Sequence, residues 1–249
     1  MSNISKVNSS WVSELSWPEI EQRIKVGACA LLPVGASAKE HGLHLPMNTD
    51  YLQAKWLSDK LALQSNLLIW PVVNYGYYPA FVNFPGSVTL SETTFSSMIK
   101  DILTSIFNTG ILRLALLNTG ISTIKPLDEI VTGYDGDLRL INVYSGKLFK
   151  KTSSQIIDQT AGGHAGETET SIMLAINKSL VNMRKASGSL QACSQPGVLS
   201  RNDRQSLNYT PTGACGAPHL ATLEKGSALL KAMLGDINNQ LNEFGVPAY

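Results

Sequence analysis

Residues 29–50 read CALLPVGASAKEHGLHLPMNTD, in which an unbroken apolar run, Cys29–Val34, leads directly into a polar turn. Such a run bounded by glycine is typical of a strand that is buried on both faces of a parallel sheet. The polar residues after it are then at the carboxyl end of the strand, where open α/β sheets bind their ligands. This stretch therefore predicts a fold class and the place of a site.

Further apolar runs and amphipathic stretches alternate along the chain. The expected strands are Asn66–Val73, Leu112–Thr119 and Leu138–Ser145, and the expected helices include Tyr51–Leu63, Ser91–Thr109 and Ala221–Phe244. This alternation predicts one α/β domain over residues 1–249, with a mostly parallel sheet covered by helices on both faces. Residues 185–216 are poor in aliphatic side chains and are expected to form a long surface excursion, such as a lid or a partner contact.

Composition excludes several classes of protein. With 16% charged residues and a formal net charge of +1, the 249-residue chain lacks the basic surface that nucleic-acid binding requires. No apolar run reaches the roughly 20 residues that span a bilayer, and the polar start MSNISKVNSS does not resemble a signal peptide. We expect a cytoplasmic protein without nucleic-acid or membrane partners. Its three cysteines, odd in number and widely spaced, are expected to be buried free thiols.

The turn after the first strand contains metal-binding residue types. Imidazole from His41 and carboxylate oxygen from Glu40 and Asp50 suit Zn, Mn or Fe(II). The alternative is a set of solvated polar groups on a surface turn. We expect His44, in the same turn, to be a structural histidine or one that supports a ligand.

A second polar cluster, GGHAGETETSIMLAI at Gly162–Ile176, precedes an apolar helical pattern. Helix capping by Thr168 or Thr170, with glutamates favoured by the helix dipole, accounts for the acids. It does not account for His164, and an imidazole beside carboxylates is a usual general acid–base arrangement. The two glycines before it indicate a backbone that passes close to another group.

Two other segments lie where they can border the same cleft. NTGIST, Asn118–Thr123, follows an expected strand and either lines the cleft or forms an anion-binding backbone nest. The aromatic segment Tyr75–Phe81 either walls the pocket or belongs to the core or a subunit contact.

Two motifs, PVGASAKEHGLHLPMNTD at Pro33–Asp50 and HAGETETSIMLAI at His164–Ile176, resemble those of the creatininase family of metal-dependent amidohydrolases. The likeness extends over nearly the whole chain through LSWPEIEQRI, NFPGSVTLS and GAPHLATLEKG. Two departures stand out. Lys39 occupies the place where the family usually has a glutamate, and NTGISTIKPL lacks the histidine of the family's middle motif.

The resemblance implies a metal-dependent amidohydrolase that cleaves a non-peptide C–N bond in a small molecule, such as a cyclic amide or a formamide, with a metal-activated water. It implies one or two divalent ions, Zn, Mn or Fe, bound by Glu40, His41, Asp50 and Glu169. His164, helped by Glu167, would transfer a proton, and Lys39, Ser122 and Thr123 would bind substrate. The family also implies a homo-oligomer, commonly a hexamer.

A hypothesis of another class follows from the two departures. A family member that has lost its metal would be catalytically silent and would serve as a small-molecule-binding or assembly subunit. Lys39 is its main support, and the retention of His41, Asp50, His164 and Glu169 favours the enzyme.

Overall fold

A computed structural model of the protein describes residues 9–63, 66–189 and 196–246. Four parallel strands form one sheet in the order β2-β1-β3-β4, namely β1 (Cys29–Val34), β2 (Leu67–Ile69), β3 (Arg113–Asn118) and β4 (Asp137–Asn142). The main helices are α1 (Trp17–Lys25), α2 (Thr49–Ala62), α3 (Glu92–Asn108), α4 (Ile124–Thr132), α5 (Lys147–Ile156), α6 (Glu167–Asn177) and α7 (Leu223–Glu243). Five short 3-10 helices are also described: η1 (Val12–Glu14), η2 (Pro79–Phe81), η3 (Lys178–Leu180), η4 (Met183–Lys185) and η5 (Pro218–Leu220).

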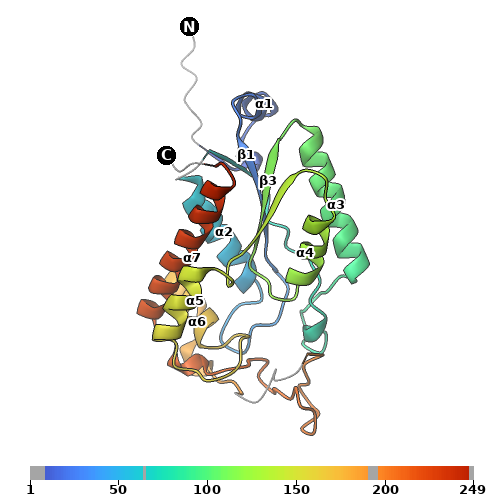
Figure 1. Cartoon of the computed structure of the whole chain (residues 1–249). Helices are drawn as coiled ribbons and strands as arrows, with labels where there is room; N and C mark the ends of the chain where they lie inside the picture. The colour runs from blue at the N-terminus through green and yellow to red at the C-terminus, as the bar shows by residue number, and fades with distance from the viewer. Residues whose placement is uncertain (1–8, 64–65, 190–195, 247–249) are drawn as a thin grey trace.

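Helices cover both faces of the sheet (Figure 1), as the sequence predicts. Successive side chains of a strand point to opposite faces. On β1, Leu31 packs in the core beneath α2, α5, α6 and α7, whereas Leu32 packs in the core beneath α3 and α4. Because both faces are covered, β1 needs apolar residues at every position, and all six of its residues are buried.

The predicted second strand is longer than the observed one. Only Leu67–Ile69 pairs with β1 as a strand. Further along, Val73 forms an isolated parallel β-bridge with Val34. Pro71 lies between Ile69 and Val73 and has no N–H to donate to a sheet. The other predicted strands and helices agree with the observed elements to within a few residues.

The irregular segment 196–216, orange in Figure 1, lies at the end of the molecule where β1 leads into the loop before α2. It includes buried residues, among them Leu199, Ala214 and Cys215. The prediction of free thiols is correct for Cys29, which is buried and unbonded, and wrong for Cys215, which is disulfide-bonded. Cys193 lies outside the described residues. No described helix has the length and apolar character that crossing a membrane requires.

Helices α6 and α7 pack closely, and Gly226 at the start of α7 faces the backbone of α6. A Cβ atom at Gly226 would overlap with the carbonyl oxygen of Ser171. The backbone, unlike the end of a flexible side chain, cannot move aside without separating the two helices. Gly226 therefore sets the distance between α6, which contains candidate site residues, and the helix behind it.

We predict that Gly226→Ala lowers the free energy of unfolding by about 1–3 kcal/mol, the usual cost of overpacking. Chemical denaturation followed by circular dichroism measures this change. Ser227→Ala, at the exposed neighbouring position, is the matched control and should change stability by less than about 0.5 kcal/mol. Equal stability of the two variants would contradict the close packing.

Candidate functional site

The loop between β1 and α2 places an ammonium, an imidazole and a carboxylate in direct contact. Nζ of Lys39 lies 2.6 Å from Oδ2 of Asp50, and Nε2 of His41 lies 3.0 Å from Oδ1 of the same carboxylate. Asp50 belongs to the first turn of α2, where the helix dipole favours a negative charge. All three residues are buried. The loop is therefore a packed cluster of charges and not a solvated turn.

The start of α6 brings a second group of side chains to the first. Nε2 of His164 lies 2.9 Å from Oε2 of Glu40, and its Nδ1 lies 3.8 Å from Oε2 of Glu169. Oε2 of Glu169 also accepts a hydrogen bond of 2.5 Å from the backbone N–H of Ala165. Ala165 has a φ of 48°, a left-handed conformation that is costly for alanine and that occurs often at functional sites.

Three side chains of the two groups form a donor set suited to a cation. One nitrogen each of His41 and His164 and one oxygen of Glu169 lie within 4.8 Å of one another, and all three residues are buried. Nδ1 of His41 lies 2.9 Å from the carbonyl oxygen of Lys39. With the proton on Nδ1, the lone pair of Nε2 remains for a cation, which is the arrangement usual for metal-binding histidines.

The cluster carries more negative than positive charge. The carboxylates of Glu40, Asp50 and Glu169 are buried with one ammonium, that of Lys39. Burial by itself lowers the pKa of Lys39, but Asp50, Glu169 and Glu40 together raise it above its usual value, so the amine stays protonated. Conversely, burial raises the pKa of Asp50, and Lys39 and His41 hold it well below its usual range. Apart from the two imidazoles, the three carboxylates exceed the single ammonium by two negative charges.

A cavity of about 280 Å³ gives access to the cluster. Lys39, His164 and Glu169 line one part of it, and Ile121 and Ser122 from the loop after β3 line another. The ring of Phe81 closes the wall, with its centroid 4.4 Å from that of His164 and 5.0 Å from Nζ of Lys39. Both interpretations of the aromatic segment apply to Phe81, which lines the cavity and also belongs to a buried apolar cluster with Tyr78.

A family model named Creatininase and described as creatinine amidohydrolase matches residues 13–241. The chain belongs to the creatininase family. It is 28% identical over 256 residues to the creatinine amidohydrolase of Pseudomonas putida, with 94% of this chain and 97% of the relative covered. It is 25% identical over 250 residues to the mycofactocin precursor peptide peptidase of Mycobacterium ulcerans, with 94% and 89% covered.

Solved creatininase structures have the same fold. A creatininase variant in complex with creatine aligns with a TM-score of 0.75 at 24% identity, covering 95% of this chain and 99% of that one. A manganese creatininase aligns with a TM-score of 0.74 at 23% identity, and a variant of the Zn-Zn type with 0.76 at 24% identity, each covering 94% of this chain and 98% of the other.

The creatininase fold of this chain does not bring every predicted residue to the cavity. Glu167 is fully buried, and its Oε2 accepts hydrogen bonds from the backbone N–H groups of Asp158 (2.9 Å) and Gln159 (2.6 Å). Its Oε1 pairs with Lys225 of α7. Glu167 therefore joins the loop before α6 to α7, and the partner of His164 is Glu40.

Two threonine predictions are also corrected. Thr123 is buried and does not line the cavity. Its hydroxyl is hydrogen-bonded to Oδ1 of Asn118 at 2.7 Å and to the carbonyl oxygen of Gly120 at 3.0 Å. Thr168 and Thr170 do not cap α6, which begins at Glu167 with Gly166 at the N-cap. Thr170 instead contacts His44, with 2.8 Å between Oγ1 and Nε2.

Sequence reasoning missed the segment that backs His164 and Glu40. Cys215 and His164 exchange backbone hydrogen bonds, with Cys215 N–H donating at 2.7 Å and His164 N–H at 3.3 Å. Gly213, with a φ of 83°, has no room for a Cβ atom, which would overlap with Oε1 of Glu40. In the sequence, only the glycines of TGACG, residues 212–216, indicate that this backbone passes close to another group. They do not identify which distant residue it contacts.

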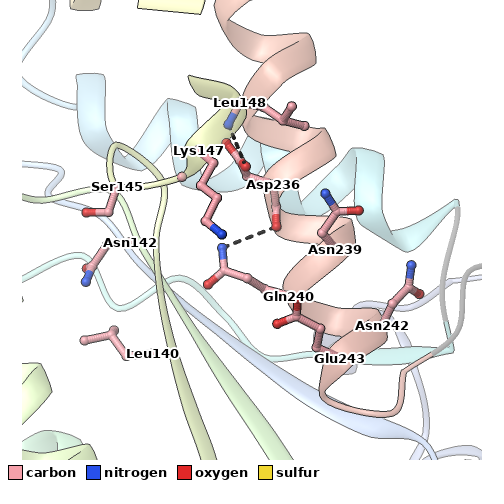
Figure 2. Close-up of a pocket in the computed structure, with 11 residues that line it drawn as sticks. Leu140, Asn142, Ser145, Lys147, Leu148, Asp236, Asn239, Gln240, Asn242 and Glu243 are labelled. Atoms are coloured by element: carbon pink, nitrogen blue, oxygen red, sulfur yellow. Dashed lines mark hydrogen bonds between the residues drawn. The ribbon is translucent and has the colours of Figure 1, made fainter. Parts of the chain in front are cut away.

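A larger cavity, of about 720 Å³, lies elsewhere, between the end of β4 and α7. Figure 2 shows the residues that line it. No histidine or cysteine lines it. Its buried carboxylate, Asp236, accepts hydrogen bonds from the backbone N–H groups of Leu148 (3.0 Å) and Phe149 (2.7 Å), so that it stabilises the start of α5. The cluster of titratable side chains is thus at the smaller cavity.

The environment of His44 generates a pH prediction. Burial, followed by the nearby His41, lowers the pKa of His44 to about 4, and its Nδ1 has no hydrogen-bond partner among the described residues. The pKa of His44 is near 6.5 in the unfolded chain and about 4 in the folded protein. At pH values between these two, the unfolded chain binds more protons at His44 than the folded protein does. Stability from a neutral His44 is therefore present above about pH 6.5 and is lost as the pH falls toward 4.

We predict that on going from pH 7 to about pH 4.5 the native protein loses about 2 kcal/mol more free energy of unfolding than His44→Gln does. Glutamine keeps a polar group for Thr170 and does not titrate. Urea denaturation of both proteins at both pH values measures the difference. Parallel pH profiles would show that His44 is not buried in the neutral form.

Proposed function

We propose that this chain is a metal-dependent hydrolase that cleaves the C–N bond of a small amide, with one divalent cation bound by His41, His164 and Glu169. One observation carries the proposal: a buried N, N, O donor set, in a cluster of three carboxylates and one ammonium, borders a cavity large enough for a small molecule. The Pseudomonas putida relative named creatinine amidohydrolase, similar over 94% of this chain, supports amide hydrolysis.

The residues fit one divalent ion better than two. Two imidazole nitrogens and a carboxylate leave a fourth position for water, which is the usual composition of a catalytic zinc site and also suits Mn or Fe(II). One divalent ion would balance the charge of the cluster. A second ion would leave an excess of positive charge and would need Asp50, whose two oxygens already face Lys39 and His41.

A cation at this place would supply Lewis-acid polarisation of the amide carbonyl and a water of lowered pKa. The ammonium of Lys39, which lines the cavity, can donate a hydrogen bond to the amide oxygen as negative charge develops there. The hydroxyl of Ser122 offers a second hydrogen bond to substrate. Phe81 shields this wall of the cavity from water.

His164 has two possible tasks, and Glu40 serves in both. With its proton on Nε2, His164 donates a hydrogen bond to Glu40 and presents the lone pair of Nδ1 to a cation. As a proton carrier, it would instead deliver a proton to the departing nitrogen, with Glu40 stabilising the imidazolium. Loss of metal in His164→Ala would identify the first task, and loss of turnover with full metal content would identify the second.

The substrate we propose is a cyclic amide or a formamide-type molecule. A cavity of about 280 Å³ is at the small end of ligand pockets, which suits a small molecule better than a peptide segment. The relative from Mycobacterium ulcerans is named as a peptide peptidase, so that a panel of substrates should contain both classes.

A second candidate function is ligand binding without catalysis. Lys39 lies 2.6 Å from Asp50, so an ammonium of the chain itself already occupies the anionic cluster. Protonation of both His41 and His164 would balance the remaining charge without a metal. Such a protein would bind a small molecule in the same cavity and leave it unchanged.

Elemental analysis of the protein purified without chelator and without a histidine tag separates these candidates. We predict about one divalent ion per chain, the stoichiometry of a site with three protein ligands. His41→Ala and Glu169→Gln should each lose most of this metal. Hydrolysis of a panel of small amides should stop with it, measured as the ring-opened product for cyclic amides such as creatinine and as released ammonia or amine for open-chain amides.

His219→Ala is the matched control, since His219 is exposed and lies outside the cluster, and it should keep the full metal content. A native protein that takes up no metal after reconstitution would reject the hydrolase and favour the binding protein. Metal that persists in His41→Ala would reject the ligand set.

A further inference from the structure

A second cavity adjoins the one at the charged cluster. It has a volume of about 290 Å³ and shares four lining residues with the first, namely Ile121, Gly162, Gly163 and Glu169. Ile121 is half exposed and stands on the loop after β3, at the boundary between the two spaces. A molecule bound with one end at His164 can therefore extend past Ile121 without rearrangement of the backbone.

One wall of the second cavity is aromatic and aliphatic. Tyr144 and Phe149 pack edge to face with ring centroids 5.5 Å apart, and Ile157 continues this surface. The two rings thus form one continuous apolar surface of the cavity.

Two polar groups of this wall, the Tyr144 hydroxyl and the side-chain oxygen of Gln159, are hydrogen-bonded to protein. The Tyr144 hydroxyl donates to Oε1 of Gln53 at 2.5 Å. Oε1 of Gln159 accepts from the backbone N–H groups of Glu167 at 2.8 Å and Ala217 at 3.1 Å. At this wall a ligand group therefore meets the ring of Tyr144, whose hydroxyl already has a hydrogen-bond partner.

We propose that this second cavity, walled by Tyr144, Phe149 and Ile157, is a specificity pocket that binds an apolar ring or branched group attached to the carbonyl side of the amide. The inference rests on the proposed function, because it takes the charged cluster as the place where the amide head binds. The pocket selects substrates by burying their apolar part, while Lys39 and the cluster hold the polar part.

Ser153 and Ser154 on α5 provide a matched pair for the test. Ser153 lines the second cavity and is absent from the lining of the first, whereas the exposed Ser154 lines neither. Ser153→Phe should fill the pocket, and Ser154→Phe should add the same side chain at the surface of the same helix. Neither serine belongs to the charged cluster or lines the cavity beside it.

The experiment measures the dissociation constants of benzamide and acetamide by isothermal titration calorimetry. The two ligands share a carboxamide and differ in the apolar group. We expect native protein and Ser154→Phe to bind benzamide at least tenfold more tightly than acetamide, and Ser153→Phe to lose this preference while its affinity for acetamide stays unchanged.

Equal affinities of the native protein for the two amides, or a preference that survives in Ser153→Phe, would overturn the specificity pocket. The amide panel of the preceding section tests hydrolysis separately. A preference for benzamide that depends on Ser153, found in a protein that hydrolyses no amide, would reject the hydrolase and leave the pocket in place.

Discussion

The buried ion pair between Lys39 and Asp50 is the contact on which the whole site depends. Asp50 is fully buried, and a carboxylate so far from water is strongly destabilised unless a positive group, here the ammonium of Lys39, pairs with it. Lys39 faces one of its oxygens and His41 the other, with contacts of 2.6 and 3.0 Å. These two contacts fix the conformation of the loop after β1, and with it the orientation of the imidazole that we propose as a ligand.

The fold supplies this arrangement by bringing three segments to one end of the sheet. The loops after β1 and β3 lie at the carboxyl ends of neighbouring parallel strands, and the start of α6 meets them there. Cys215 and Gly213 then close the site from behind through the backbone bridge to His164 and the contact with Glu40. The segment 196–216, which the sequence suggests is a surface excursion, is therefore partly a wall of the site.

Local signals in the sequence were sufficient for the elements and insufficient for the orientation of side chains. The apolar run Cys29–Val34 predicts β1 because a strand covered on both faces needs apolar residues throughout. Glu167 and Glu169 look equivalent in the sequence, but residues two apart on a helix point in different directions. Only Glu169 faces His164, whereas Glu167 faces Lys225. The contact between Gly213 and Glu40 joins residues far apart in the chain, and no local pattern encodes it.

Because the ammonium of Lys39 lies within the anionic cluster, a bound metal would not be needed to neutralise Asp50. A cluster whose charge is balanced only by bound ions is destabilised when the ions leave. Here Lys39 is part of the chain, so one positive charge stays beside Asp50 whether or not a cation is bound. The loop conformation is then maintained by Lys39 and Asp50, while a cation at His41, His164 and Glu169 would contribute to chemistry. Pairing of the buried Asp50 carboxylate therefore needs no bound ion, because the ammonium that faces it belongs to the chain.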